Sequence, residues 1–264
     1  MPSHKFHPSE YAKFDQTHTW IETSLVHQSS AQLSCLATNE ASHLDAIDVA
    51  PNEGKLLYLL TKLAKAKRVL EIGTLGGYSA LWFAKAVAPL GGKVVSLELS
   101  PKHAEVARKN FEKAGFGEVV EIRVGKAVET LEKMGKEGEG EFDVVFIDAD
   151  KENNVRYLEW AVKLGKVGTL VVVDNVVRQG KVLADGDAAS EGVRRAFEWM
   201  GGNKRLEATA IQTVGPKGWD GFAVAVVVEG CLGSDEWAKK GKKLEAFEDS
   251  MKYFKAWQMV KDIV

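Results

Sequence analysis

Short apolar runs alternate with amphipathic segments along most of this 264-residue chain, from Arg68 to about Glu229. The runs are rich in Val and Ile, lack strict apolar–polar alternation, and mostly end at Gly, Asp or Glu. This pattern predicts parallel strands that are covered by helices on both faces, and therefore an α/β fold. The predicted strands are residues 68–72, 93–97, 119–124, 143–147, 169–173 and 221–228, and the predicted helices 78–87, 101–114, 154–164 and 188–200.

The segments outside this alternation show no boundary between domains. The N-terminal third is helical in pattern and ends in the amphipathic stretch 52–65, and residues 134–141 form a polar loop rich in Gly and Glu. After residue 230, apolar residues recur at helical spacing. Without a Gly/Ser linker or an internal repeat, we expect one domain: a helical cap (1–67), the α/β core (68–229) and a C-terminal helical extension (230–264).

Composition excludes several classes of protein. With 35 Lys and Arg against 37 Asp and Glu, the formal charge of −2 disfavours strong nucleic-acid binding, and no apolar run is long enough to cross a membrane. Cys35 and Cys231 form neither a disulfide framework nor a zinc-ligand pattern, which is typical of a reducing compartment. The polar start lacks a secretory segment and the Arg content of a mitochondrial presequence. We expect a cytoplasmic protein, with the mitochondrion as the alternative.

Carboxylates follow four of the predicted strands. Glu71, Glu98, Asp148 and Asp174 each stand at or just after the end of an apolar run. Ligands of open α/β sheets bind outside the carboxyl ends of the strands, where these four side chains would meet. One such carboxylate is usually a solvated surface group, but four at the same edge predict a functional site.

A glycine-rich turn, E-I-G-T-L-G-G-Y-S from Glu71 to Ser79, follows the first predicted strand. Its glycine spacing is not G-x-G-x-x-G, and no phosphate-loop lysine follows, which disfavours a dinucleotide or a nucleoside triphosphate. Glu71 could accept hydrogen bonds from an ammonium group, and Glu98 from both hydroxyls of a ribose. The pattern therefore favours a nucleoside with an amino-acid-like tail, such as S-adenosylmethionine. The alternative is a turn that serves only helix–strand packing.

Two acidic motifs follow consecutive strands: D-A-D-K at residues 148–151 and D-N at 174–175. On neighbouring strands, Asp148, Asp174 and Asn175 would offer three oxygen ligands, and a divalent cation would relieve the repulsion between the two carboxylates. Oxygen ligands favour Mg²⁺, with Mn²⁺ or Ca²⁺ as alternatives. All six histidines lie before residue 104, which disfavours a zinc hydrolase. Alternatively, the two aspartates are separate groups that bind loop amides.

Taken together, these motifs resemble those of a known family, the cation-dependent class I O-methyltransferases of the caffeoyl-CoA and catechol O-methyltransferase group. The resemblance extends over about residues 44–228, with D-A-D-K and D-N as its most specific parts. It implies a Rossmann-like fold with a seven-stranded, mostly parallel sheet whose last strand is antiparallel, usually in a homodimer. The segments that carry it are residues 52–57, 70–79, 98, 142–151, 174–175 and 180–182.

The resemblance also assigns roles to individual residues. Asp148, Asp174 and Asn175 correspond to metal ligands, and Lys151 to the general base, so that Lys151 and Asp148 form the catalytic pair. Where plant enzymes have Trp and Asn in a loop that contacts the acceptor, this chain has Arg178 and Gln179, which argues against caffeoyl-CoA. The residues implied for S-adenosylmethionine are Val49, Glu71, Gly73, Thr74, Ser79, Glu98, Ala127 and Asp148.

The expected function is therefore methyl transfer from S-adenosylmethionine to a small aromatic diol, such as a catechol, a caffeoyl derivative or a flavonoid. Two vicinal hydroxyls would chelate the cation and hold one oxygen in line with the methyl group, while Lys151 takes the proton. The alternative role for Lys151 is a salt bridge to Asp150. The alternative functions are methylation of a hydroxylated tRNA base, which the near-neutral charge disfavours, and a non-catalytic cofactor-binding protein, which would need neither the acidic cluster nor the lysine.

Overall fold

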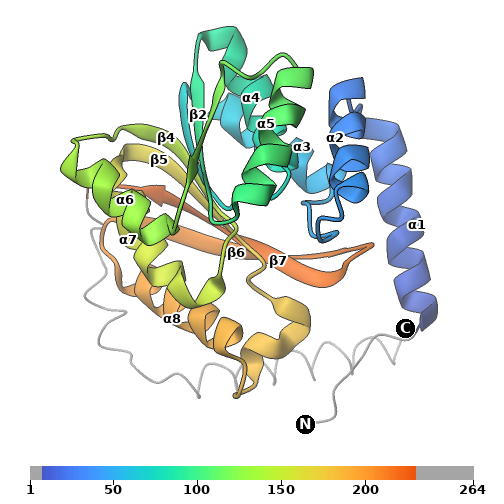
Figure 1. Ribbon diagram of the computed structural model, residues 1–264. Coiled ribbons are helices and arrows are strands. Elements are labelled where there is room, and N and C mark those ends of the chain that lie inside the picture. The colour runs from blue at the N-terminus through green and yellow to red at the C-terminus, as the bar shows by residue number, and fades with distance from the viewer. Residues whose placement is uncertain (1–7, 230–264) are drawn as a thin grey trace. The chain divides into compact units, whose positions relative to one another are not determined.

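A seven-stranded sheet in the order β3-β2-β1-β4-β5-β7-β6 forms the centre of the fold (Figure 1). The computed structural model describes residues 8–229. The first five strands are parallel, and β7 is antiparallel to both of its neighbours, β5 and β6. These findings confirm the predicted fold class. The strands are β1 (Arg68–Ile72), β2 (Lys93–Glu98), β3 (Val120–Val124), β4 (Phe142–Ile147), β5 (Gly165–Asp174), β6 (Leu206–Gly215) and β7 (Gly218–Val227).

Helices cover both faces of the sheet. One face packs against α6, α7 and α8, and the other packs against α2, α3, α4 and α5. The α-helices are α1 (Pro8–Leu25), α2 (Ser30–Ala41), α3 (Pro51–Leu63), α4 (Tyr78–Val87), α5 (Pro101–Lys113), α6 (Ala127–Lys136), α7 (Asn154–Leu164) and α8 (Ala188–Gly202). The short 3-10 helices are η1 (Ala88–Leu90), η2 (Lys151–Asn153) and η3 (Arg178–Leu183).

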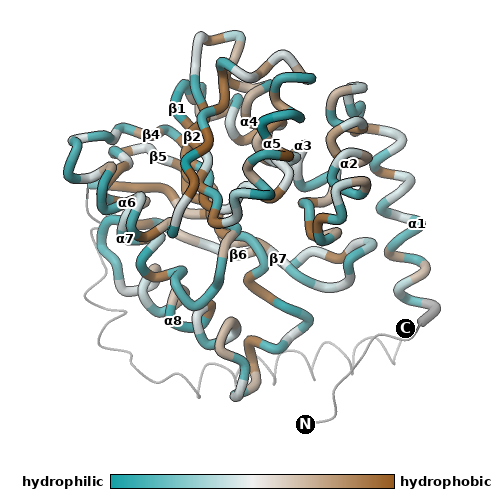
Figure 2. The backbone as a smooth tube through the Cα atoms, viewed as in Figure 1, coloured by the Kyte–Doolittle hydropathy of each residue, from teal (hydrophilic) through white to brown (hydrophobic). Residues whose placement is uncertain are grey.

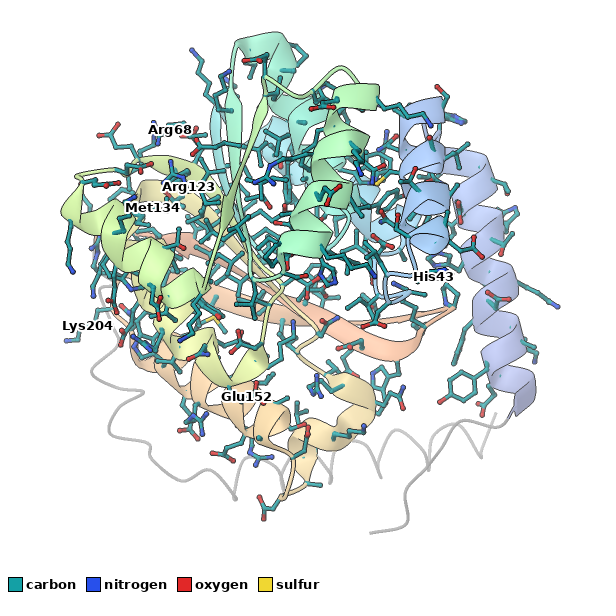
Figure 3. All side chains as sticks on the ribbon, viewed as in Figure 1. His43, Arg68, Arg123, Met134, Glu152 and Lys204 are labelled. Atoms are coloured by element: carbon teal, nitrogen blue, oxygen red, sulfur yellow. The ribbon has the colours of Figure 1, made fainter. Side chains whose placement is uncertain are left out.

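The strand sequences explain why both faces are covered. Along β4, Val144 and Phe146 belong to one apolar core and Val145 and Ile147 to the other, because successive side chains of a strand point to opposite faces. The central strands therefore form hydrophobic stretches in Figure 2. Met134 is buried between α6 and the sheet, whereas Lys204, which follows α8, is exposed (Figure 3).

Two elements were not among those predicted. β6 lies at the edge of the sheet and its side chains are mostly exposed, so it has no continuous apolar run. α6 buries only a narrow stripe, Val128, Leu131 and Met134, and its last residues, 134–136, begin the segment predicted to be a loop. In both cases the hydrophobic signal is weaker than in the central elements.

The chain divides into two compact units, Met1–Gly230 and Cys231–Val264. The second unit contains the predicted C-terminal helix and lies outside the described residues. Among the described helices, none combines the length and apolar character that a membrane-crossing segment requires.

The order of the strands locates the ligand crevice. From β1 the chain adds β2 and β3 on one side and then β4 and β5 on the other, so the strand order reverses between β1 and β4. In open α/β sheets a ligand binds at such a switch point, outside the carboxyl ends of the strands.

Candidate active site

A cavity of about 1470 Å³ opens at this edge of the sheet. Because a single small-molecule site occupies roughly 300–1,000 Å³, this cavity can hold a cofactor and a second molecule together. Apart from Glu71, all the predicted site residues line it: Val49, Gly73, Thr74, Ser79, Glu98, Ala127, Asp148, Lys151, Asp174, Asn175, Arg178 and Gln179.

The glycine turn lies directly against the end of β4. Gly73 has φ +104°, and a Cβ there would clash with the backbone carbonyl of Asp148. The backbone N–H of Asp148 donates to the carbonyl of Ile72 at 2.8 Å, which joins the two strand ends. Gly77, with φ +87°, is the N-cap of α4. The packing of the turn therefore requires glycine at both positions, and the same turn forms one wall of the cavity.

Glu98 connects the end of β2 to the glycine turn. Its Oε2 accepts hydrogen bonds from the backbone N–H groups of Thr74 at 3.1 Å and Leu75 at 2.8 Å. Its Oε1 accepts the N–H of Ser100 at 2.8 Å and lies 3.4 Å from Nδ1 of His103. The carboxylate is mostly buried but lines the cavity; Oε2 already accepts two hydrogen bonds, so Oε1 is the oxygen that can still accept one from a ligand hydroxyl.

Glu71 lies beneath the turn rather than in the cavity. The side chain is completely buried, and both of its oxygens accept hydrogen bonds from hydroxyls, those of Ser79 at 2.6 Å and Ser96. Burial raises the pKa of Glu71 to about 8, against the opposing effect of these two hydrogen bonds. Contact with an ammonium group of a ligand, the role implied for Glu71, stays a prediction, since its oxygens are occupied by serines here.

The two acidic motifs meet at the ends of β4 and β5. Ile147 pairs with Val173 across these strands, so the residues that follow them, Asp148 and Asp174, come side by side. Burial and the nearby carboxylates of Asp148 and Glu53 raise the pKa of Asp174 well above its usual range. Two ionised carboxylates side by side are therefore unfavourable here unless a further positive charge is added.

Lys151 brings its amino group to this cluster. It is 6% exposed, and its Nζ lies 2.9 Å from Oδ1 of Asp148. The alternative partner considered above, Asp150, instead accepts hydrogen bonds from the hydroxyl of Tyr157 and the amide of Asn153. Lys151 therefore points toward the acidic cluster and the cavity.

The donor set fits a divalent cation with oxygen ligands. Asp174 Oδ1 accepts the backbone N–H of Asn175, and the Asn175 side chain makes no hydrogen bond to another described residue. Within residues 8–229, no three His, Cys, Asp or Glu side chains group as a metal site. Two carboxylates and an amide, with the remaining positions left to water, are nevertheless a donor set that suits Mg²⁺.

The loop that carries Arg178 is held from the neighbouring strand. Asp220 in β7 accepts three backbone N–H groups through Oδ1, those of Val177 and Arg178 at 3.0 Å and of Gly221 at 2.9 Å. Asn175 and Arg178 have φ values of 57° and 53°, backbone conformations that residues other than glycine rarely adopt. The two hydrogen bonds that Val177 and Arg178 donate help to hold this strained backbone in place.

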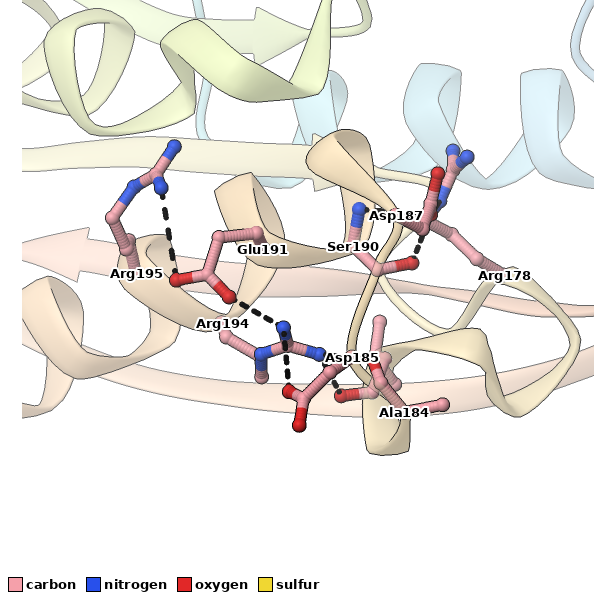
Figure 4. A network of polar contacts seen from close by, with 9 residues as sticks. Arg178, Ala184, Asp185, Asp187, Ser190, Glu191, Arg194 and Arg195 are labelled. Atoms are coloured by element: carbon pink, nitrogen blue, oxygen red, sulfur yellow. Dashed lines mark hydrogen bonds and ion pairs between the residues drawn. The ribbon is translucent and has the colours of Figure 1, made fainter.

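Further contacts attach the same loop to α8 (Figure 4). Asp187 caps α8 by accepting the N–H of Ser190 at 3.0 Å, and it lies 3.5 Å from Nε of Arg178. Arg194 donates to the carbonyl of Ala184 at 2.6 Å. Arg178 therefore lies between the cavity and the N-terminus of α8.

Two residues of this site were not predicted as site residues. Glu53, near the N-terminus of α3, accepts the N–H of Ala50 at 2.9 Å and reaches the acidic cluster. Glu53 belongs to residues 52–57, one of the segments that carry the family resemblance, and this is the signal by which the sequence could have marked it. Asp220 is distant in sequence from the loop it holds, and no local pattern marks its role.

The similarities to known proteins agree with this geometry. Residues 22–216 match the family described as O-methyltransferase. The chain belongs to this family. The O-methyltransferase is 50% identical to a catechol O-methyltransferase from Mycobacterium tuberculosis, over 79% of this chain and 93% of that protein. A catechol O-methyltransferase from Niastella koreensis is 44% identical, over 81% of this chain and 97% of that protein.

A solved structure confirms the fold and supports the cofactor. The O-methyltransferase from Bacillus cereus in complex with SAH superimposes with a TM-score of 0.80 at 44% identity, over 82% of this chain and 99% of that chain. The present protein is thus an S-adenosylmethionine-dependent O-methyltransferase, as the sequence motifs predicted.

Proposed function

We propose that this O-methyltransferase methylates one hydroxyl of a vicinal aromatic diol. The reaction would use a divalent cation, preferably Mg²⁺, bound by Asp148, Asp174 and Asn175. The two relatives named as catechol O-methyltransferases support the acceptor class. The observation that carries the proposal is the position of Lys151 Nζ, 2.9 Å from Oδ1 of Asp148 and beside Asp174, in a cavity with room for two molecules. Mn²⁺ and Ca²⁺ remain the alternative cations.

The order of the strands gives each part of the cavity a role. The glycine turn and Glu98 follow β1 and β2, where Thr74, Ser79, Val49 and Ala127 would contact S-adenosylmethionine. The acidic cluster follows β4 and β5, next in the sheet. The cofactor and the diol would therefore lie side by side, which methyl transfer in line requires.

As the neutral amine, Lys151 would accept the proton from the reacting hydroxyl at Nζ and become the ammonium. Its burial and its contact with Asp148 hold the side chain in one position, which a general base needs. A bound cation would lower the pKa of the chelated hydroxyl. Arg178 and Gln179 line the cavity and would contact the acceptor ring.

We also propose that the protein forms a homodimer. Large apolar side chains are exposed on the N-terminal helices, among them Trp20 on α1 at 68% and Leu63 on α3 at 79%. Such side chains are typical of an interface when they form a patch. Sedimentation at micromolar concentration would give the mass of two chains; a single-chain mass at every concentration would contradict this.

The test is methyl transfer from labelled S-adenosylmethionine to catechol and caffeic acid, with Mg²⁺ and with chelator. We expect activity that is lost with chelator and restored by Mg²⁺, and an Asp174→Asn variant that binds S-adenosylmethionine but no longer responds to Mg²⁺. Asp185→Asn, an exposed carboxylate, is the matched control. Activity that persists in chelator would contradict the requirement for a cation. Cofactor binding without transfer to any diol would contradict the proposed class of acceptor.

A further inference from the structure

The positive charges around the cavity differ in how closely they are paired. Three cations of the cavity wall have a carboxylate nearby, in the ion pairs Lys126–Glu129, Lys151–Asp148 and Arg156–Glu132, with N···O distances of 3.2, 2.9 and 3.1 Å. The side chain of Arg178 also lines the cavity, but its pairing is looser. Its only carboxylate partner within residues 8–229 is Asp187, which lies 3.5 Å from Nε and does not line the cavity.

The carboxylate of Asp187 is already occupied by another residue. Its Oδ2, the oxygen nearest to Arg178, accepts the backbone N–H of Ser190 at 3.0 Å and the hydroxyl of the same residue. These two hydrogen bonds use the two lone pairs of that oxygen. In agreement, the pKa of Asp187 is lowered chiefly by Ser190 and less by Arg178. Asp187 therefore compensates the guanidinium charge only in part.

The two terminal nitrogens of Arg178 keep their donors free. In the part of the chain that the structure describes, no group accepts a hydrogen bond from Nη1 or Nη2. Nε is buried, whereas Nη1 and Nη2 are accessible, and the side chain as a whole is 25% exposed. In Figure 4 the guanidinium points away from Ala184 and Asp185 of the same loop. A ligand in the cavity can therefore reach these two nitrogens.

The place of Arg178 in the fold assigns it to the acceptor. Its loop follows β5, which β4 separates from β1 and the glycine turn, so Arg178 and the cofactor residues lie on different sides of the acidic cluster. Arg178 stands three positions after Asn175, and a chain of that length spans at most about 11 Å. A single aromatic ring whose diol is held at the proposed cation site could therefore extend to this guanidinium.

The chemistry of the guanidinium selects the group that it would bind. Nη1 and Nη2 lie in one plane and present parallel N–H donors, an arrangement that matches the two oxygens of a carboxylate. An uncharged substituent would leave the positive charge of Arg178 to Asp187 alone. An anion on the acceptor would compensate it.

We propose that Arg178 determines the specificity for the acceptor by binding a carboxylate on its ring through Nη1 and Nη2. The substrate class is then a single-ring vicinal diol acid, such as a dihydroxybenzoate, rather than an uncharged catechol. This inference rests on the proposed function and adds the part of the acceptor that the acidic cluster does not contact.

The experiment compares two probes with the full-length enzyme and Mg²⁺: the vicinal dihydroxybenzoate whose carboxylate lies para to one hydroxyl, and its methyl ester, which keeps the diol and removes the charge. We expect kcat/KM to favour the acid about 10- to 100-fold, mostly through KM, the effect of hydrogen bonds between charged groups. Arg178→Met should bring the ratio close to one. Arg178→Lys, which keeps the charge without the planar pair of donors, should retain part of it. Arg205→Met, an exposed arginine outside the cavity, is the matched control and should keep the wild-type ratio.

The outcomes separate the two proposals. A wild-type ratio near one overturns the carboxylate site while leaving the methylation of diols intact. A ratio that persists in Arg178→Met, with equal losses for acid and ester, also overturns the site, because the arginine then only holds the loop. Transfer to neither probe nor to catechol, with S-adenosylmethionine bound, overturns the proposed function and the site together. If Arg178→Met fails to fold, the ratios of wild type and Arg178→Lys still decide the question.

Discussion

Glu71 and Lys151 are both buried, but the protein treats their charges differently. Glu71 has only hydroxyl partners, and burial raises its pKa to about 8. Lys151 has a carboxylate partner, Asp148, in the wall of the cavity. Burial favours the neutral form of Glu71, whereas the contact with Asp148 holds the Lys151 side chain in one position. Glu71 supports the glycine turn from below, and Lys151 lines the cavity beside Asp148.

Replacing Lys151 by Met should lower kcat by about 10²- to 10⁴-fold, the usual contribution of a general base. The affinity for S-adenosylmethionine should change far less, because Nζ of Lys151 contacts Asp148 and not the glycine turn. Steady-state kinetics and calorimetry measure the two quantities, with the exposed Lys113→Met as the control. Equal losses in turnover and in cofactor affinity would contradict the role as base.

Glu71 makes the stability of the protein depend on pH. Because its pKa in the fold, about 8, exceeds the ordinary value of 4.5, only the unfolded chain releases the proton between these values, and stability falls as pH rises through this window. Glu71→Gln cannot ionise. Its Tm relative to wild type should rise from about pH 5 to pH 8 and then level off, measured by thermal unfolding in chelator.

The exposed Glu152→Gln is the control for this series. A difference in Tm between Glu71→Gln and wild type that stays constant from pH 5 to pH 9 would show that Glu71 titrates normally in the fold.

Among the elements, the loop between β5 and α8 depends on groups outside itself. Its backbone takes left-handed conformations at Asn175, Arg178 and Gln179. Hydrogen bonds that the loop donates to Asp220 in β7, together with contacts with α8, hold it in place. The same loop begins with the proposed cation ligands Asp174 and Asn175. The geometry of the ligands is therefore coupled to the start of β7, more than forty positions later in the chain.

Replacing Asp220 by Ala should weaken Mn²⁺ binding about 10- to 100-fold, the usual effect of losing a group that orients metal ligands. S-adenosylmethionine affinity should stay near wild type, because Glu98 and the glycine turn lie on other strands. Asp220→Asn keeps one oxygen acceptor, so its affinity for Mn²⁺ should lie between those of wild type and Asp220→Ala. Paramagnetic titration of Mn²⁺ and calorimetry of the cofactor are the measurements.

Asp185→Ala serves as the control for Asp220, since its carboxylate belongs to the same loop but is exposed. A parallel loss of Mn²⁺ and cofactor binding in Asp220→Ala would indicate general unfolding instead of a local effect on the loop.

At the scale of the whole molecule, the part shared with relatives is shorter than the chain. The alignments cover 93% and 97% of the two catechol O-methyltransferases but only 79% and 81% of this chain. The family match ends at residue 216, and the first compact unit ends at Gly230. The methyltransferase core is thus complete before the C-terminal unit begins.

A chain that ends at Gly230 should therefore fold, bind S-adenosylmethionine with wild-type affinity and keep methyl transfer within about twofold. The residues proposed to hold the cofactor, the cation and the acceptor all lie before this point. Calorimetry and the catechol assay compare the truncated and full-length proteins. Loss of cofactor binding on truncation would show that residues 231–264 contribute to the core.

The sequence was sufficient for much of the fold. The central strands and the helices that cover them were predicted from apolar periodicity, because a sheet buried on both faces needs continuous hydrophobic runs. β6 escaped prediction because an edge strand with exposed side chains needs no such run. The adjacency of Asp148 and Asp174 also followed from local motifs, since consecutive strand ends meet at one edge.

Long-range contacts account for the rest. That Glu71 lies under the turn, that Glu53 joins the acidic cluster, and that Asp220 holds the loop of Arg178 follow only from the packed fold. His18 of α1 likewise meets Asn52 of α3 only in the packed fold. Periodicity and motifs are local properties of the chain, whereas burial, charge and hydrogen-bond partners depend on residues that are distant in sequence and close in space.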